Sequence, residues 1–210
     1  MDGPFAAAMA DLPLVAILRG VKPAEAPDIL RALTGEGFVL IEVPLNSPEP
    51  LASIRAMRAI APPGVLIGAG TVLRAADVDS VAQAGGALIV MPHCDAAIIG
   101  AAKARGLIAL PGVATPSEAF AALAAGADGL KAFPAEMIAP SIVKAWRAVL
   151  PAAAPILPVG GITPESMAPY VAAGAAGFGL GSALYKPGDG AERVARNAAA
   201  FVAAWRSLPR

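Results

Sequence analysis

One lysine lies where a charged side chain is unfavourable. Lys131 belongs to the run Gly129-Leu130-Lys131-Ala132-Phe133, which has no carboxylate directly beside the lysine and predicts a short buried strand ending at a turn. Burial disfavours the ammonium form and lowers the pKa of the amine, and a neutral amine can attack a carbonyl carbon. We therefore interpret Lys131 as a nucleophile. The alternative is a structural lysine at a strand end whose ammonium group reaches solvent.

A carboxylate occupies a similar position earlier in the chain. Glu42 lies within Leu40-Ile41-Glu42-Val43-Pro44, an apolar run in which a carboxylate needs a partner or a task. Burial raises the pKa of a carboxyl group, so near Lys131 this side chain could carry protons as a general acid and base. The alternative is a structural ion pair with Lys131 or Arg19. The two interpretations overlap, because a catalytic pair can also be an ion pair.

Further polar groups follow the other apolar runs. Arg19 has the planar fork that binds carboxylates and phosphates, although it could equally form a salt bridge at the rim. Thr71 could donate a hydrogen bond to a substrate, or could simply be a turn residue. The loops Gly160-Gly161 and Gly181-Ser182 predict a phosphate site, because glycine lets main-chain N–H groups approach an anion. The single histidine, His93, either approaches the substrate or has no role.

The elements that must position these groups repeat along the chain. A short apolar run is followed by a loop rich in Gly, Pro, Ser or Thr, and then by an Ala-rich helical stretch. The runs are continuously apolar, as in parallel strands covered on both faces. We predict strands at 14–18, 38–43, 65–68, 87–90, 107–110, 129–131, 156–158 and 177–179. We predict helices near 23–34, 48–60, 74–84, 95–105, 116–125, 138–149, 164–173 and 189–206.

About eight such units close most naturally into a single (β/α)8 TIM barrel, one α/β domain over residues 1–210 with a short N-terminal helix at its bottom. An open doubly wound sheet has less support, because Arg19-Gly20-Val21-Lys22 is not a dinucleotide-binding loop. Thr115-Pro116 and Thr163-Pro164 predict helix starts, whereas Gly126 and Gly174 predict helix ends. In a barrel the carboxyl ends of the strands meet at one mouth, so the polar groups above are expected to converge.

The composition argues against several functional classes. The formal net charge is zero and the 16 basic residues are scattered, so neither a nucleic-acid nor a membrane-surface partner is expected. The longest nearly apolar stretch, 167–185, is interrupted by Pro169 and several glycines, so a membrane span is not expected. Cys94 is the only cysteine, which suits a reducing cytoplasm. With a single histidine, the chain offers no zinc-ligand set, so neither a metal nor another cofactor is expected.

At this point the chain resembles the family of 2-keto-3-deoxy-6-phosphogluconate and 2-keto-3-deoxy-6-phosphogalactonate aldolases, which are class I aldolases on a small (β/α)8 barrel. The resemblance runs from 14–20 to 179–182. Its other motifs are Ile41-Glu42-Val43-Pro44-Leu45-Asn46-Ser47-Pro48, Ile67-Gly68-Ala69-Gly70-Thr71-Val72-Leu73, Pro111-Gly112-Val113-Ala114-Thr115-Pro116, Leu130-Lys131-Ala132-Phe133-Pro134-Ala135 and Pro158-Val159-Gly160-Gly161-Ile162.

The resemblance implies a role for each candidate residue. Lys131 is then the Schiff-base lysine and Glu42 the proton-transfer carboxylate. Arg19 and Thr71 match contacts to the pyruvate-like end of the substrate. The phosphate cradle corresponds to Gly160, Gly161, Gly181 and Ser182. The resemblance also implies a homotrimer that uses no metal or other cofactor and whose partner is a phosphorylated keto-deoxy sugar acid.

The segment after the second predicted strand bears on the substrate. Gluconate-type relatives usually have Thr-Leu-Arg after the glutamate, whereas Pro44-Leu45-Asn46-Ser47-Pro48 is similar to the galactonate type. The resemblance therefore implies cleavage of 2-dehydro-3-deoxy-6-phospho-D-galactonate to pyruvate and D-glyceraldehyde 3-phosphate. Met91-Pro92-His93 departs from the Ser-Pro or Thr-Pro of relatives. The alternatives are the gluconate epimer or both epimers, an isomerase or decarboxylase barrel without an imine, and a non-catalytic phosphosugar-binding barrel.

Overall fold

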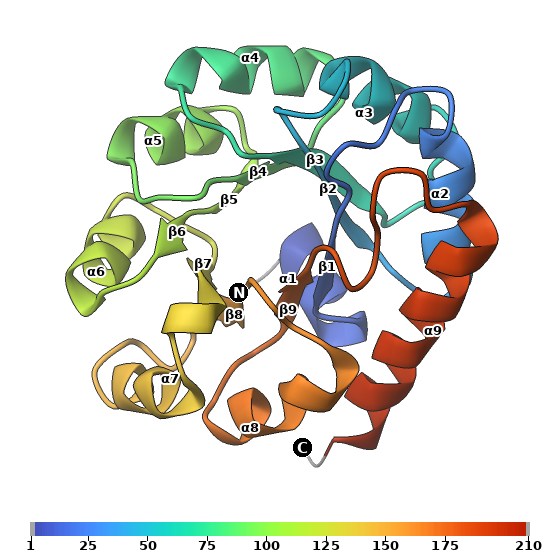
Figure 1. The fold of residues 1–210 in the computed structure, drawn as a ribbon. Helices are drawn as coiled ribbons and strands as arrows, with labels where there is room; N and C mark the ends of the chain where they lie inside the picture. The colour runs from blue at the N-terminus through green and yellow to red at the C-terminus, as the bar shows by residue number, and fades with distance from the viewer. Residues whose placement is uncertain (1–2, 209–210) are drawn as a thin grey trace.

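Parallel strands form an inner layer and helices surround it in the computed structural model, which describes residues 3–208 (Figure 1). The strands are β1 (Leu14–Ile17), β2 (Leu40–Pro44), β3 (Leu66–Gly70), β4 (Leu88–Val90), β5 (Ile108–Leu110), β6 (Gly112–Val113), β7 (Leu130–Ala132), β8 (Ile156–Pro158) and β9 (Phe178–Leu180). The helices are α1 (Pro4–Asp11), α2 (Ala26–Gly35), α3 (Pro50–Arg58), α4 (Ala75–Gln83), α5 (Ala96–Ala104), α6 (Pro116–Ala124), α7 (Pro140–Arg147), α8 (Met167–Ala172) and α9 (Ala191–Ser207). Two short 3-10 helices, η1 (Ala135–Met137) and η2 (Pro164–Ser166), follow β7 and β8.

The repeating strand–loop–helix unit predicted from the sequence is confirmed, and so are its local signals. Thr115 caps α6: its hydroxyl accepts a hydrogen bond from the Glu118 N–H at 3.3 Å, and the Glu118 carboxylate accepts one from the Thr115 N–H at 2.9 Å. Gly126 and Gly174 follow α6 and α8 with φ of 97° and 98°, the left-handed conformation that ends a helix. The helix predicted at 164–173 begins as η2 and continues as α8.

The strands belong to two parallel sheets, whereas the sequence predicted one closed sheet. One sheet has the order β5-β4-β3-β2-β1-β9, and the other has the order β6-β7-β8. Pro111 separates β5 from β6, because proline has no N–H to donate to the ladder. Its carbonyl still accepts a hydrogen bond from the Lys131 N–H at 2.9 Å. On the opposite side a single parallel bridge, Val159 to Gly179, connects the end of β8 to β9.

The N-terminal helix covers the amino-terminal ends of the strands, as predicted. Phe5 and Ala8 of α1 are buried in one cluster with Val15, Leu40 and Leu66, which lie at or near the beginnings of β1, β2 and β3. In Figure 1 α1 lies behind the strands, near the centre of the ring. This packing closes the interior at one end, so that only the carboxyl ends of the strands can open to solvent.

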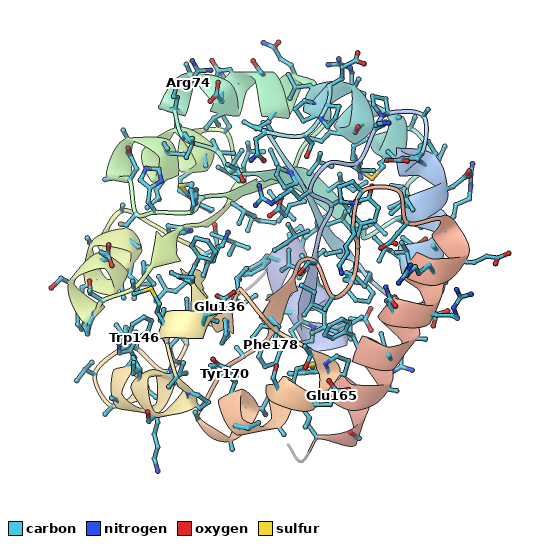
Figure 2. All side chains as sticks on the ribbon, viewed as in Figure 1. Arg74, Glu136, Trp146, Glu165, Tyr170 and Phe178 are labelled. Atoms are coloured by element: carbon cyan, nitrogen blue, oxygen red, sulfur yellow. The ribbon has the colours of Figure 1, made fainter. Side chains whose placement is uncertain are left out.

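A second, larger core lies between the strands and the outer helices. Trp146 of α7 is 3% exposed, and the Trp205 ring meets Phe178 of β9 edge to face at 6.3 Å. Phe178 makes a similar contact with Tyr170 at 6.2 Å (Figure 2). Both tryptophans therefore contribute to the packing of this core. Among residues 3–208, no helix combines the length and the apolar sequence needed to cross a membrane.

A substitution at Gly177 would test how closely β9 is packed. A Cβ at this buried glycine would collide with the main-chain oxygen of Pro13, next to the pairing of β9 with β1. We expect Gly177→Ala to lower the free energy of unfolding by roughly 1–3 kcal/mol, measured by chemical denaturation. Gly35→Ala is the matched control, because a Cβ at Gly35 would meet nothing within 4 Å. Equal losses in the two variants would contradict this account of the packing.

Candidate active site

Lys131 is buried in the interior, where β7 places it. The residue is 7% exposed. Burial lowers the pKa of the amine, the charge of Glu42 opposes that effect, and the charge of Arg19 lowers the pKa further. The Nζ atom lies 4.6 Å from the centre of the Phe133 ring. No ion pair joins Lys131 to a carboxylate within residues 3–208, so direct pairing does not fix the lysine in its charged form.

Glu42 points into the same interior from β2. It is 1% exposed, and its Oε2 atom has no hydrogen-bond partner within the described part of the chain. Burial raises the pKa of Glu42 to about 7, although the charges of Lys131 and Arg19 act in the opposite direction. A carboxyl group with this pKa can both accept and return a proton near neutral pH. Gly70 of β3 makes room for it, because a Cβ there would collide with the carboxylate.

The two buried ionisable groups line one small cavity inside the strands. This inner cavity has a volume of about 10 Å³, and its lining residues are Val15, Ile17, Glu42, Val90, Leu110, Lys131, Leu157, Val159 and Gly179. Every side chain in that set except Glu42 and Lys131 is apolar. The two groups therefore share a low-dielectric environment, in which their mutual influence is strong.

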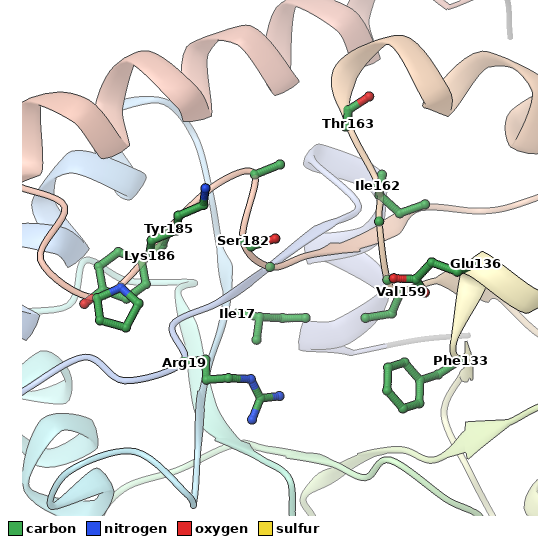
Figure 3. A pocket seen from close by; sticks show the side chains of 15 residues that line it. Ile17, Arg19, Phe133, Glu136, Val159, Ile162, Thr163, Ser182, Tyr185 and Lys186 are labelled. Atoms are coloured by element: carbon green, nitrogen blue, oxygen red, sulfur yellow. The ribbon is translucent and has the colours of Figure 1, made fainter.

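A larger outer cavity adjoins the inner one, and Ile17 and Val159 belong to the walls of both. The outer cavity has a volume of about 380 Å³ and lies at the carboxyl ends of the strands (Figure 3). Its lining residues are Ile17, Arg19, Phe133, Glu136, residues 159–163, residues 181–183 and residues 185–187. The shared wall places the apolar interior next to an open pocket that also contains charged side chains.

The two glycine loops predicted to hold a phosphate line the outer cavity. Gly160 and Gly161 follow β8 with φ of 117° and 62°, a backbone that other residues rarely adopt. Gly181 and Ser182 follow β9 and face the same space. All four residues therefore line one cavity, although they follow different strands.

Arg19 lies at the end of β1, on the wall of the outer cavity. It is exposed, and its Nη1 atom donates a hydrogen bond to Asn46 Oδ1 at 2.7 Å. No acidic side chain pairs with it among residues 3–208, so the rim salt bridge considered from the sequence is not formed. Its positive charge lowers the pKa values of both Glu42 and Lys131.

Thr71 and His93 lie at the same end of the molecule but line neither cavity. Thr71 follows β3 with φ of 52°, a left-handed conformation that is strained for a β-branched residue. The His93 side chain is 45% exposed and has Asp95 as its acidic neighbour, 3.9 Å away. In residues 3–208 no three His, Cys, Asp or Glu side chains are grouped so that they could hold a metal ion.

Two charged residues of the outer cavity were not predicted. The carboxylate of Glu136, on η1, packs against Gly160 and Gly161 (Figure 3). Lys186 lies in the loop after β9. A signal was available in the sequence, because the two residues follow Lys131 and Ser182 by only five and four positions. Whether these side chains face the cavity depends on the path of η1 and of the loop after β9. A local sequence pattern does not reveal that path.

Comparison with known proteins assigns the chain to a family. A family model described as "Aldolase: KDPG and KHG aldolase" matches residues 6–195. The chain belongs to this family. It is also 51% identical to the probable 2-dehydro-3-deoxy-6-phosphogalactonate aldolase of Rhizobium meliloti (strain 1021), over 93% of this chain and 92% of the relative. The chain is therefore an aldolase, a carbon–carbon lyase.

Solved structures of relatives have the same fold. A structure described as native KDPGal superposes with a TM-score of 0.91 at 48% identity, covering 93% of this chain and 95% of that one. A KDPG aldolase from Legionella pneumophila, described with pyruvate captured at low pH as a covalent carbinolamine intermediate, superposes with a TM-score of 0.81 at 25% identity. That comparison covers 100% of this chain and 99% of the Legionella chain.

The raised pKa of Glu42 predicts how the stability of this aldolase depends on pH. The folded-state pKa of about 7 lies above the ordinary value of 4.5, so between these values the folded state holds a proton that the unfolded state has lost. Stability should therefore fall as pH rises from about 4.5 to about 7 and then level off. Glu42→Gln has no carboxyl group to titrate, so it should not lose stability in this way. The melting temperature of the variant minus that of the wild type should therefore increase by several degrees between pH 5 and pH 8.

Glu118→Gln is the control for this measurement. The pKa of Glu118 is lowered, chiefly by its hydrogen bond from the Ala114 N–H, so this carboxylate is ionised in both the folded and the unfolded state above pH 5. Its difference in melting temperature from the wild type should stay constant from pH 5 to pH 8. A constant difference for Glu42→Gln would show that Glu42 has no raised pKa.

Proposed function

We propose that this aldolase cleaves 2-dehydro-3-deoxy-6-phospho-D-galactonate to pyruvate and D-glyceraldehyde 3-phosphate through a Schiff base on Lys131. The observation that carries the proposal is a buried amine with a lowered pKa beside a buried carboxyl group with a raised pKa, lining one apolar cavity. The name of the Rhizobium meliloti relative supports the substrate. The carbinolamine described for the Legionella protein supports covalent catalysis by an amine.

The first step forms the imine. The neutral Nζ of Lys131 adds to the C2 ketone of the substrate to give a carbinolamine. The carbinolamine takes a proton from the Glu42 carboxyl group and loses water, which gives a protonated imine and leaves Glu42 as a carboxylate. Burial favours the neutral amine that this attack requires. The positive imine then withdraws electrons from the neighbouring carbon–carbon bond.

The second step breaks that bond. The Glu42 carboxylate removes the proton of the C4 hydroxyl, the C4 oxygen becomes an aldehyde, and the electrons of the C3–C4 bond form an enamine with C2 and C3. Glyceraldehyde 3-phosphate leaves, and Glu42 returns its proton to C3. Water then hydrolyses the imine, which releases pyruvate and regenerates Lys131. A pKa of about 7 suits both directions of this proton transfer.

The remaining site residues bind the two ends of the substrate in this scheme. Arg19 binds the pyruvate-like end, and the absence of an acidic partner for it in the described residues leaves donors for a carboxylate. Thr71 lines neither cavity, so its contact with the same end rests on the resemblance alone. The phosphate occupies the outer cavity against Gly160, Gly161, Gly181 and Ser182. An elongated substrate would then extend from the inner cavity into the outer one, along the wall that they share.

We also propose how the barrel is closed, how many subunits the protein has and where it is located. The two sheets act as one closed (β/α)8 barrel in a single domain over residues 1–210, supported by the hydrogen bond from the Lys131 N–H to Pro111 and by the Val159–Gly179 bridge. The resemblance to homotrimeric aldolases supports a homotrimer. A phosphorylated sugar acid as substrate, together with Cys94 as the only cysteine, supports a cytoplasmic location.

Borohydride trapping tests the Schiff base. Reduction in the presence of pyruvate should add one stable adduct, located on Lys131 by mass spectrometry of peptides. Lys131→Ala should form no adduct and should lose turnover by several orders of magnitude. Glu42→Gln keeps the amine, so it should still form the adduct while turnover falls sharply. Activity retained by Lys131→Ala, with no adduct in the wild type, would reject the scheme.

A paired cleavage assay tests the choice of epimer. The galactonate and gluconate forms of the substrate differ at one hydroxyl-bearing carbon, and binding differences of this kind change kcat/KM by roughly 10-fold or more. We expect a higher kcat/KM for the galactonate epimer, measured by coupling the release of pyruvate to lactate dehydrogenase. A higher kcat/KM for the gluconate epimer would overturn this part of the proposal.

A further inference from the structure

We propose that Asn46 is a positioning residue, which orients Arg19 toward the carboxylate of the pyruvate half of the substrate. This inference rests on the function proposed above. Its starting observation is the 2.7 Å hydrogen bond that Arg19 Nη1 donates to Asn46 Oδ1, between residues that follow different strands. Asn46 itself does not line the outer or the inner cavity, so its effect on the site passes through Arg19.

The backbone beside Arg19 is already fixed from two sides. The Gly20 N–H donates a hydrogen bond to Ser47 Oγ at 2.9 Å, and Ser47 is only 8% exposed. Gly20 has φ of 84°, and a Cβ there would lie 2.7 Å from Pro187 Cγ, in the loop after β9. The loops after β2 and β9 therefore hold this corner between them. These backbone contacts do not fix the long, exposed Arg19 side chain. Its hydrogen bond to Asn46 restrains it.

The chemistry of the asparagine amide suits this task. An amide oxygen accepts one guanidinium N–H and leaves the positive charge of Arg19 unneutralised. Arginine has five N–H donors, so several remain for the carboxylate of the substrate. An aspartate at position 46 would also accept the hydrogen bond, but its negative charge would pair with Arg19 and compete with the substrate. The sequence motif around Asn46 thus influences the substrate through the arginine rather than by direct contact with the sugar.

The experiment measures how the borohydride-trapped adduct depends on pyruvate concentration. Asn46→Ala should raise the half-saturating pyruvate concentration about tenfold, because a hydrogen bond to a charged group is lost, while the adduct formed at saturation stays unchanged. Asn46→Asp should raise that concentration further. In an Arg19→Ala background, adding Asn46→Ala should have no additional effect, because the two residues act as one unit.

Asn197→Ala is the matched control. Its side-chain amide donates a hydrogen bond to the Leu184 carbonyl at 3.0 Å, away from Arg19, so its pyruvate dependence should equal that of the wild type. An unchanged half-saturating concentration in Asn46→Ala would overturn the role of Asn46 and leave the proposed function intact. Additive effects of Asn46→Ala and Arg19→Ala would have the same consequence. A wild type that forms no adduct at any pyruvate concentration would instead reject the proposed function, and this inference with it.

Discussion

Lys131 and Glu42 share one apolar cavity. Burying a charged group costs free energy, and the properties of the site depend on that cost. Burial favours the neutral form of each group, so it lowers the pKa of Lys131 and raises that of Glu42. Their mutual attraction favours the charged forms, but it is the smaller effect for both groups. The balance favours the neutral amine that the proposed nucleophile requires and gives the carboxyl group a pKa of about 7. An exposed pair of the same residues would have neither property.

The fold maintains this dry environment from several directions. The α1 helix covers the amino-terminal ends of the strands with Phe5 and Ala8, which belong to the same buried apolar cluster as Val15 and Leu40. Gly70 leaves the space that the Glu42 carboxylate occupies. Only the carboxyl ends of the strands open outward, into the cavity lined by Arg19 and the two glycine loops. The architecture thus keeps the inner cavity of Lys131 and Glu42 adjacent to, but distinct from, the outer cavity that contains Arg19 and the glycine loops.

The outer cavity is not uniformly positive, although its proposed ligand is an anion. Arg19 and Lys186 supply positive charge, whereas the Glu136 carboxylate packs against the glycines that follow β8. In the proposed binding mode the anion would contact chiefly main-chain N–H groups, and the nearby cations would add a general attraction. Such an arrangement would select a phosphate more by its shape than by its charge. It also makes the direction of the Arg19 side chain important, because this is the cation that influences both buried groups.

The order of strands and helices, apart from β6, could be predicted from the sequence alone, as could the ends of α6 and α8 and the two unusual residues Lys131 and Glu42. These are local signals, because a charge within an apolar run or a Thr-Pro pair before a helix is visible without knowing the fold. The three-dimensional structure was needed to show that Pro111 separates β5 from β6, that Glu136 and Lys186 line the outer cavity, and that Asn46 accepts a hydrogen bond from Arg19. The physical reason is that these features depend on which strand ends meet in space: Arg19 and Asn46 are 27 positions apart, and no local pattern encodes a hydrogen bond between them.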